Sequence, residues 1–469
     1  MMRMTNRARW TATAAGIAAA AVLAIGACTD FKNNLLEPQN PGLIDPTAVG
    51  SPAAAMALKV GAMGRVRFVV DCGGNSECLW EEAGSLADEF HNSDFQNVRQ
   101  DIDQRQIADD NVEVPWNSVT QNRGFVRDAI DKVKQFLPDN NADIGELYMG
   151  LGFLEMSLGE NYCNGIPLGH TVAGAVTYGK PLTDAEVLDS ASAHVDTALT
   201  LTTGTDEASV AVHRAALILK ARILTDQGKF SDAAKLVTTS AVPSDYQYLF
   251  ASSAANTNDD LGIWVINTET ARMTVSDSVE IVGGKPSVTK NALPFVSAKD
   301  PRVPVASGQD VSPKVGPEDG STPMFVQLLY GRDDPIPMAS GIDARLIEAE
   351  AMLNASDFAG MMSILNALRA APPAIGLYEP AAMPALPTPA TKDAATTLFF
   401  REKAFWTFAR GQRLNDQRRL MRQYGRSEDN VFPTGAYFKG GTYGTSIQLP
   451  VPNSERTNPL FTGCIDRNP

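Results

Sequence analysis

LFFREKAFWTFARGQRLNDQRRLMRQYGR, the stretch from Leu398 to Arg426, carries the most specific pattern of this chain. Apolar residues recur in it at helical spacing and predict a helix with one broad buried face: Phe400, Ala404, Phe405, Phe408 and Ala409. The other half carries guanidinium groups that can reach carboxylates or backbone carbonyls of neighbouring elements: Arg410, Arg413, Arg418, Arg419 and Arg422, with Asp416 among them. We expect a core helix, with contact to a ligand as the alternative.

A second distinctive segment is LPVPNSERTNPL, Leu449 to Leu460. Three prolines, Pro450, Pro452 and Pro459, remove backbone donors and bias the residues before them toward extended conformations. The segment is therefore predicted to be extended rather than helical.

Together these segments resemble the C-terminal signature of the SusD/RagB family of outer-membrane nutrient-binding lipoproteins. The family's aromatic helix ends in a series that is filled here by Gly411, Arg413, Asp416, Arg418 and Arg419. Its terminal L-P-[IV]-P…E…NP segment is filled by Leu449, Pro450, Pro452, Glu455, Asn458 and Pro459. One departure is visible, because many members carry a glutamate just before the glycine, where this chain has Ala409 and Arg410.

The resemblance implies a protein that captures an oligosaccharide or another nutrient and delivers it to a TonB-dependent, SusC-like outer-membrane transporter. It implies a mainly α fold, with a tetratricopeptide-like scaffold of helical hairpins and an irregular, loop-rich insertion that contains short strands. Such a protein binds and gates without making or breaking bonds, so we expect no enzyme activity. Two other classes stay open: a scaffold lipoprotein that organises envelope proteins, and a secreted glycoside hydrolase.

The first 27 residues have the features of a bacterial lipoprotein signal peptide. Arg3, Arg7 and Arg9 precede a short alanine-rich apolar run, which is shorter than the about 20 residues of a membrane span. The run ends in Ile25-Gly26-Ala27-Cys28, where small residues suit a signal peptidase and the Cys28 thiol can accept a lipid. We predict an outer-membrane protein at the cell surface that is anchored through Cys28, with an ordinary secretory peptide as the alternative.

Charge restricts the partners of the mature chain. The whole chain has a net charge of −14, and residues 1–27 contribute three arginines and no acid. This acidic balance argues against binding to nucleic acid or to a bare anionic membrane, so lipid is the expected membrane contact.

The remaining chain is predicted to be organised around helical hairpins. Helical spacing recurs within 146–158, 210–240 and 343–370, and in the last two a turn with Gly or Asp precedes a phenylalanine and a second helix. Ser51 and Pro52 predict the start of the first helix, which we expect to extend to Phe68. The predicted parts are a tether (28–50), a helical part (51–240), an insertion (241–340), a second helical part (341–426) and an extended tail (427–469). Within the insertion, Gly262 to Asn267 and Val275 to Val282 are predicted strands.

Four cysteines besides Cys28 allow two disulfides with three connectivities. Cys72 and Cys78 flank a Gly-Gly-Asn-Ser turn, so a local bridge between them is the first hypothesis. Cys163 would then pair with Cys464 and tie the tail to the helical body. A zinc site built from the four thiolates is the alternative, although the chain has no CxxC pair.

Motifs for catalysis or metal binding are largely missing. The chain has no HExxH, GxSxG or GxxxxGK[ST] motif and four histidines in total. A glycosidase needs two carboxylates that flank the scissile bond, and the adjacent acids here are better explained as solvated charge: Asp88/Glu89, Asp333/Asp334 and Glu348/Glu350. We expect no cofactor and no metal, with a weak calcium signal at Asn258, Asp259 and Asp260.

A saccharide site would need flat aromatic rings together with polar groups that pair with hydroxyls. The aromatic residues outside clear helix faces are the candidates for ligand binding: Trp80, Tyr246, Tyr248, Trp264 and Tyr330. Trp116 and Trp406 lie in helical context and are expected in the core. For Trp80, a core position is the alternative.

Overall fold

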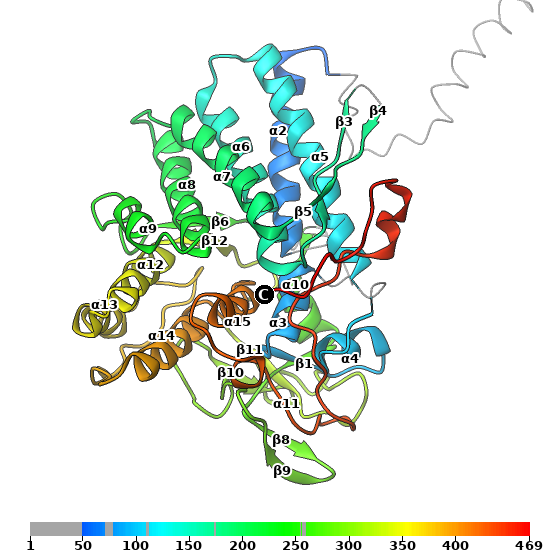
Figure 1. Ribbon diagram of the computed structural model, residues 1–469, viewed down its shortest axis with the longest axis vertical. Helices are drawn as coiled ribbons and strands as arrows, with labels where there is room; N and C mark the ends of the chain where they lie inside the picture. Colours follow the sequence, from blue (N-terminus) through cyan, green and yellow to red (C-terminus); the bar gives the residue numbers. More distant parts are fainter. Residues whose placement is uncertain (1–48, 71–77, 109–111, 173–174, 254, 256–258) are drawn as a thin grey trace, which may run out of the picture. The chain divides into compact units, whose positions relative to one another are not determined.

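The structure is a computed structural model that describes residues 49–70, 78–108, 112–172, 175–253, 255 and 259–469. The chain divides into two units, residues 1–50 and Ser51–Pro469, and the helices and strands among the described residues belong to the second unit (Figure 1). The predicted signal peptide, the lipidation site Cys28 and almost the whole tether lie outside the described residues.

Long helices dominate the first half of this unit: α2 (Pro52–Val66), α3 (Leu79–Leu86), α4 (Asn97–Asp103), α5 (Glu113–Phe136), α6 (Asn141–Asn161), α7 (Asp184–Leu201), α8 (Glu207–Asp226) and α9 (Phe230–Leu236). Helices α2, α5, α6, α7 and α8 stand side by side in Figure 1, and α6 packs on α2, α5, α7 and α8. The predicted first helix is confirmed: Ser51 caps α2 by accepting the Ala54 N–H at 3.2 Å, with Pro52 in the first turn.

The second half contains α12 (Gly341–Asn354), α13 (Phe358–Ala370), α14 (Lys392–Trp406) and α15 (Arg413–Arg422). The α8–α9 and α12–α13 pairs are the two predicted hairpins, and α12 packs on both α8 and α9. Gly228 and Ser356 adopt left-handed conformations in the two turns, with φ of 75° and 62°. The expected scaffold of stacked helical hairpins is therefore present.

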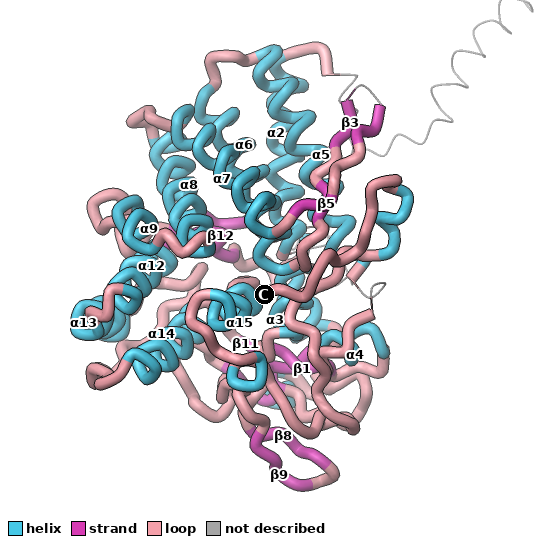
Figure 2. The backbone as a smooth tube through the Cα atoms, in the orientation of Figure 1, coloured by secondary structure: helices cyan, strands magenta, loops and turns pink. Residues whose placement is uncertain are grey.

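Strands are short, and each sheet among the described residues consists of two antiparallel strands (Figure 2). The strands are β1 (Phe90–Asn92), β2 (Ile166–Pro167), β3 (His170–Val172), β4 (Ala175–Thr177), β5 (Pro181–Leu182), β6 (Gln247–Phe250), β7 (Met273–Val275), β8 (Val279–Val282), β9 (Lys285–Val288), β10 (Val305–Ser307), β11 (Phe325–Gln327) and β12 (Ile336–Ser340). The pairs are β1–β7, β2–β5, β3–β4, β6–β12, β8–β9 and β10–β11. Five of these strands interrupt the part that was predicted to be largely helical, residues 51–240.

The insertion differs from its prediction at one point. Val275 to Val282 contributes to β7 and β8, as predicted, but Gly262 to Asn267 is helical: it forms α10 (Gly262–Trp264) and most of a π-helical turn, Val265–Glu269. A short apolar run does not distinguish a strand from a buried helical turn by its spacing. Buried Asn267 stabilises the helical form, because its amide donates to the carbonyls of Met273 and Phe325 and accepts from Gln327 N–H.

The signature stretch is two helices rather than the single helix that its spacing predicts. Between α14 and α15, Ala409 and Gly411 adopt φ values of 59° and 62°, which end α14 and redirect the chain. Gly411 lies directly against the Trp80 ring, where an added Cβ would come within 2.2 Å of Cδ1. The close approach of Trp80 explains why a glycine occupies this turn.

Arg410, Arg418 and Arg419 of the signature stretch are buried and ion-paired, in agreement with the predicted core role, whereas Arg422 is exposed. Arg419 pairs with Glu350 of α12, and Arg418 pairs with Asp184 of α7. Arg418 also donates to the carbonyl oxygen of Glu160 at 2.7 Å. These buried charges connect α15 to helices from both halves of the chain.

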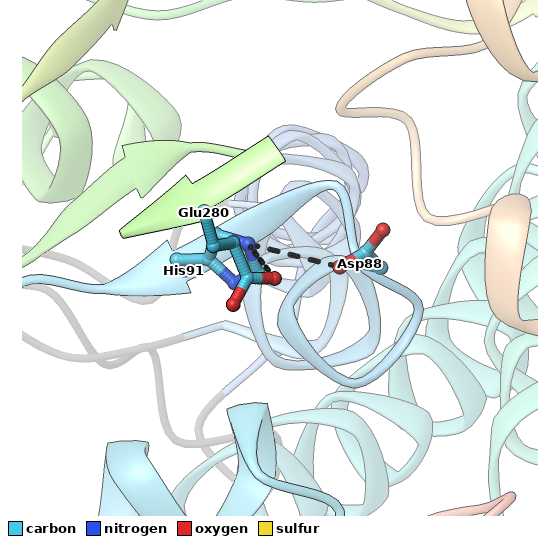
Figure 3. Close-up of side chains that lie close together, drawn as sticks. All are labelled: Asp88, His91 and Glu280. Carbon is cyan, nitrogen blue, oxygen red and sulfur yellow. Dashed lines mark ion pairs between the residues drawn. The ribbon is translucent and has the colours of Figure 1, made fainter. Parts of the chain in front are cut away.

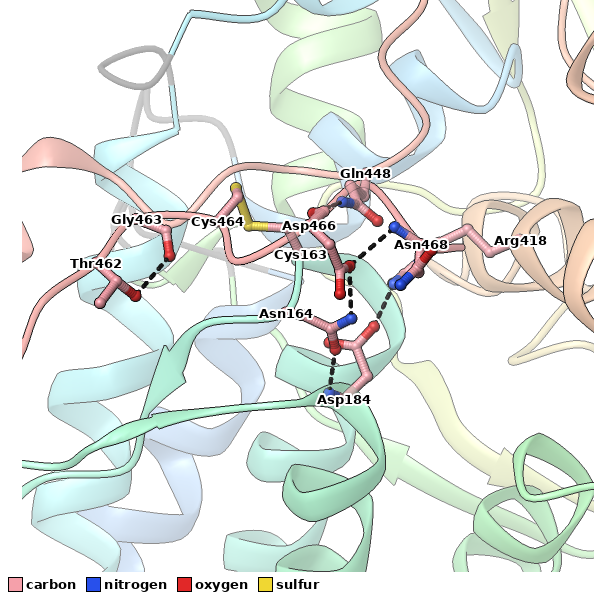
Figure 4. Close-up of a disulfide and its surroundings, with 10 residues drawn as sticks. All are labelled: Cys163, Asn164, Asp184, Arg418, Gln448, Thr462, Gly463, Cys464, Asp466 and Asn468. Carbon is pink, nitrogen blue, oxygen red and sulfur yellow. Dashed lines mark hydrogen bonds and ion pairs between the residues drawn. A yellow bond between two sulfur atoms is a disulfide. The ribbon is translucent and has the colours of Figure 1, made fainter.

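The C-terminal segment is fixed to the helical body by a disulfide (Figure 4). Cys163, just after α6, is bonded to Cys464, and the chain between them spans 301 positions. Backbone hydrogen bonds between Cys163 and Leu449 (2.9 Å) and between Ile465 and Asn164 (2.8 Å) extend this attachment. The other expected bridge involves Cys72, which lies outside the described residues.

Candidate functional site

A groove of about 540 Å³ lies between α5, the β3–β4 hairpin and the C-terminal segment. Its volume is within the range of roughly 300–1,000 Å³ that is typical of small-molecule sites. Its lining includes rings and polar side chains: Phe125, His170, Tyr178, Gln121, Arg127, Asp128, Glu455 and Asn458. The groove therefore has the two kinds of group that a saccharide or peptide ligand requires.

Helix α5 forms one wall. Gln121, Phe125 and Asp128 lie at helical spacing, so they share one face of the helix. The position where a Cβ of Gly124 would lie is open for 4 Å around, which leaves space beside Phe125. The Arg65 guanidinium of α2 lies 4.3 Å from the centre of the Phe125 ring and stabilises the ring position.

The β3–β4 hairpin forms the second wall. His170 pairs with Thr177 and Thr171 with Val176, which brings His170 and the residue after β4, Tyr178, to the base of the hairpin. Tyr178 is 45 % exposed, so its ring is available to a ligand. Gly179 fits closely at this base, because an added Cβ would approach the Leu168 and Gly169 nitrogens to 2.6 Å.

The C-terminal segment forms the third wall through the residues of its signature. Glu455 accepts the Trp116 indole N–H at 2.8 Å, which attaches the segment to α5. Asn458 donates to the carbonyl oxygen of Gly179 at 2.9 Å, which attaches it to the end of the hairpin. The Glu and Asn-Pro positions of the motif thus join all three walls of the groove.

A buried ionic network lies behind the groove and joins α5 to α6 and to the base of the hairpin. Arg123 donates to Glu155 Oε1 from Nε and Nη2 at 3.0 and 2.9 Å, and it donates to the Gly169 carbonyl at 3.2 Å. Glu155 Oε2 accepts from Ser190 at 2.8 Å and lies 2.9 Å from His194 Nδ1. Burial alone would raise the pKa of Glu155, but the hydrogen bond from His194 and the charge of Arg123 lower it to about 2. The network holds Arg123 and the base of the hairpin in place.

The five aromatic residues predicted from the sequence do not gather in this groove. Trp80 and Tyr330 are buried, at 5 % and 2 % exposure, so the core position that was the alternative for Trp80 is the observed one. Tyr246 is half-buried and donates its hydroxyl to the Ala211 carbonyl, while Tyr248 donates to Glu146. Trp264 is half-buried beside the Arg332 guanidinium, which lies 5.8 Å from its ring. Trp116 and Trp406 are in the core, as expected.

Apart from Glu455 and Asn458, which belong to the C-terminal signature, the residues of the groove are not among those that the sequence pattern indicates. Phe125 lies within a long amphipathic helix, where its ring could not be distinguished from a core residue. His170 and Tyr178 lie within residues 51–240, which the sequence pattern predicts to be largely helical. The short run of Gly and Val around the hairpin is the signal that indicates strands here.

A second polar cluster surrounds Phe95, which is 69 % exposed. Beside it, Asp94 pairs with Arg99, and Lys439 Nζ donates to the Asp94 carbonyl at 2.7 Å. Burial raises the pKa of Asp94 to about 6, which a hydrogen bond from Gln96 partly opposes. This cluster places an exposed aromatic ring beside charged groups outside the groove.

Of the acids expected to be solvated charge, Asp88, Glu89 and Glu350 are buried instead, so that expectation is wrong for these three. Glu348 pairs with Arg345 at 2.6 Å and Glu350 pairs with Arg419, whereas Asp333 is exposed. Of the suggested calcium triplet, Asp259 pairs with Arg67 at 2.7 Å and Asp260 with Arg332 at 2.9 Å, and Asn258 lies outside the described residues.

Comparison with known proteins finds similarity in structure alone. No family model matches the chain, and no curated protein matches its sequence. Solved structures match over most of their length, among them a laminarin-binding SusD-like protein with 14 % identity and a TM-score of 0.61, covering 88 % of this chain and 99 % of that one. A SusD superfamily protein from Bacteroides fragilis gives 14 % identity, a TM-score of 0.59 and the same coverage. The chain has the SusD fold.

Another similar structure is a SusD superfamily protein from Bacteroides vulgatus, at 14 % identity and a TM-score of 0.57, covering 89 % of this chain and 99 % of that one. The SusD fold confirms the expected fold class, and the signature residues now have structural roles in the core and in the wall of the groove. Within the described part of this SusD-like chain, none of the helices combines the length and apolar character needed to cross a membrane.

Proposed function

We propose that this SusD-like protein captures an oligosaccharide, or another small nutrient, in the groove between α5, the β3–β4 hairpin and the C-terminal segment. The bound ligand is then delivered to a TonB-dependent, SusC-like outer-membrane transporter. The protein acts by reversible binding and no bond of the ligand is broken.

The SusD fold is the single observation that supports this proposal most strongly. One of the similar structures is a laminarin-binding protein, so this fold can bind a carbohydrate. The groove adds chemical support, because the exposed ring of Tyr178 and the half-buried ring of Phe125 can stack on apolar sugar faces. Arg127, Asp128 and Gln121 offer donors and acceptors for hydroxyl groups.

Calorimetry of the purified chain with a panel of oligosaccharides, laminarin fragments included, tests the binding. We expect a reversible ligand whose affinity falls about tenfold in Tyr178→Ala and in Arg127→Ala, equivalent to about 1.4 kcal/mol. Tyr378→Ala, a half-buried tyrosine that does not line the groove, is the matched control. If no member of the panel binds, carbohydrate capture is rejected.

Phe95→Ala distinguishes the groove from the second polar cluster. Loss of affinity in this variant, with normal affinity in Tyr178→Ala, would move the ligand to the surface around Asp94. That result would contradict the groove as the site and would leave carbohydrate capture intact.

The proposed location is the outer face of the bacterial outer membrane, with Cys28 as the lipid-bearing residue. Mass spectrometry of the native protein should find a diacylglyceryl group on Cys28, and Cys28→Ser should release the protein from membranes. Detergent-solubilised protein from the native host should co-purify with a large barrel protein. Repeated isolation of the chain alone would contradict the transporter partnership.

The two other classes predict different outcomes. A scaffold lipoprotein would bind envelope proteins through the helical hairpins and would show no response to the oligosaccharide panel. A glycoside hydrolase would release product from at least one member of the panel, which chromatography of the incubated mixture would detect.

A further inference from the structure

Asp88, His91 and Glu280 converge at a buried point where the end of α3, strand β1 and strand β8 meet (Figure 3). His91 Nε2 lies 3.3 Å from Glu280 Oε1 and 3.8 Å from Asp88 Oδ1. One donor atom from each residue lies within 4.8 Å of the other two. All three residues are more than nine-tenths buried, at 4 %, 5 % and 6 % exposure.

Several polar atoms of this cluster lack a hydrogen-bond partner among the described residues: both carboxylate oxygens of Asp88, His91 Nε2 and Glu280 Oε2. His91 Nε2 approaches Glu280 and Asp88 as an ion pair when the ring is protonated, while both carboxylate oxygens of Asp88 have no hydrogen-bond partner among the described residues. A buried polar atom without a partner costs free energy, and native structures contain few of them. The cluster is therefore incomplete as a hydrogen-bonded network.

A second set of side chains fixes the orientation of the first. His91 Nδ1 lies 2.9 Å from Asp103 Oδ1, and Asp103 Oδ2 accepts from the Asn92 N–H and the Tyr437 hydroxyl, both at 2.7 Å. With its Nδ1–H bonded to a carboxylate, the ring directs Nε2 toward Asp88 and Glu280. Tyr443 donates its hydroxyl to Glu280 Oε1 at 2.9 Å. A carboxylate on the far nitrogen of a histidine is the usual support of a metal-binding imidazole.

The charges at this point favour a cation. Three carboxylates, from Asp88, Asp103 and Glu280, surround one imidazole ring. The buried Arg413 guanidinium also acts on Asp88, and a divalent cation would add to its compensation of the carboxylate charge.

We propose that Asp88, His91 and Glu280 bind a divalent transition-metal cation, with Zn²⁺ as the first candidate. One imidazole nitrogen and two carboxylates are a mixed nitrogen and oxygen set, which suits Zn²⁺ and its first-row neighbours. Ca²⁺ and Mg²⁺ prefer sites built from oxygen ligands alone. This inference does not depend on the proposed nutrient-binding function.

The metal would fix the position of the β8–β9 hairpin. Glu280 is the buried residue of β8, whereas Val279, Ile281 and Val288 of the hairpin are exposed. Asp88 has a φ of 65°, an uncommon conformation for a residue other than glycine, and its carbonyl accepts the Ser276 hydroxyl at 2.5 Å. A cation shared by α3, β1 and β8 would connect the first helical part to the insertion.

A calorimetric titration of the chelator-treated chain with ZnCl₂ tests the proposal. We expect one Zn²⁺ per chain, no comparable binding of Ca²⁺ or Mg²⁺, and a higher melting temperature in the presence of Zn²⁺. Glu280→Gln and Asp88→Asn should each weaken binding at least tenfold. Asp103→Asn, which leaves the three ligands in place, should weaken it by about 10–100-fold. His213→Gln, at a half-buried histidine of α8, is the control and should bind as the original chain does.

Zinc K-edge X-ray absorption on the unsubstituted chain gives a second measurement that requires no variant. We expect one imidazole and oxygen ligands, and a sulfur ligand would overturn the proposal by assigning the metal to a cysteine. Absence of Zn²⁺, Mn²⁺ and Co²⁺ binding to the unsubstituted chain would overturn it as well. Binding that is unchanged in Glu280→Gln and Asp88→Asn would overturn it too, whether or not the metal raises the melting temperature.

Discussion

Arg410 and Asp343 form a buried ion pair in which Nη1 and Nη2 of the guanidinium donate to the two carboxylate oxygens at 3.2 and 2.7 Å. Asp343 also accepts from Gln412 Nε2 at 3.0 Å and caps α12 through the Ser340 hydroxyl and N–H. Burial alone would raise the pKa of Asp343, but the charge and hydrogen bonds of Arg410 lower it. The turn after α14 is thus tied to the first turn of α12, and Arg410 is the residue that departs from the family's usual glutamate.

Arg410→Ala should lower the free energy of unfolding by about 3–5 kcal/mol, because it leaves the Asp343 carboxylate buried without its cation. Urea denaturation followed by circular dichroism measures the change. Lys235→Ala removes the exposed ion pair with Asp232 and should leave the denaturation midpoint unchanged within error. Equal midpoints for the original chain and Arg410→Ala would contradict the structural role of this pair.

The two glycines of the signature stretch should respond differently to alanine. Gly425 adopts a φ of 67° with open space around its Cβ position, so Gly425→Ala should cost about 1–2 kcal/mol for the left-handed conformation alone. Gly411→Ala should cost about 1–3 kcal/mol more, because its Cβ would displace the buried Trp80 ring. Thermal and urea unfolding of the two variants measure the difference, and equal losses would show that Trp80 yields without cost.

Much of the scaffold could be predicted from the sequence because its signals are local. The Ser51 cap, the Gly228 turn and the Asp357 cap each act within a few residues of the helix that they begin or end. The break between α14 and α15 could not be predicted, because it depends on Trp80, a residue more than 300 positions away in the chain. Helical spacing continues through the break and conceals it.

The candidate sites were missed for the same reason. Asp88 and His91 are three positions apart, which is a weak signal, and Glu280 joins them only through the fold. The groove combines α5, the β3–β4 hairpin and the C-terminal segment, so no single stretch of sequence identifies it. A ring can contact a ligand only where it is exposed, and residue type alone does not predict exposure. Trp80 has the residue type of a ligand candidate, but its ring is buried.

Acid should remove the contribution of Glu155 to stability. The pKa of this carboxyl is about 2 in the folded chain, below the 4.5 of a free glutamate side chain, so the ionised form stabilises the fold above about pH 4.5. That contribution, about 3 kcal/mol, is lost as the pH falls toward 2. Between pH 6 and 2, the free energy of unfolding should therefore fall by about 3 kcal/mol less in Glu155→Gln than in the original chain.

Urea denaturation across this range measures both pH profiles. Glu207→Gln removes an exposed glutamate of α8 and is the control for the loss of one surface charge. Parallel profiles for the original chain and Glu155→Gln would contradict the proposed network of Arg123, Glu155 and His194.

The Cys163–Cys464 disulfide should stabilise the chain and protect its C-terminal segment. Because the bridge closes a loop of 301 positions, its removal in Cys163→Ser/Cys464→Ser should lower the free energy of unfolding by about 2–4 kcal/mol. Residues near Arg467 should become more sensitive to trypsin, since the exposed Arg467 then depends on its ion pair with Glu428 and on hydrogen bonds such as Asn164 to Asp466. Glu455 and Asn458 keep their own contacts with α5 and the hairpin, so cleavage at Arg456 should rise less. Mass spectrometry of timed digests separates the two cleavages, and the reduced original chain is the control. Equal protection of Arg467 in the original chain and in the double variant would show that hydrogen bonds alone hold the segment.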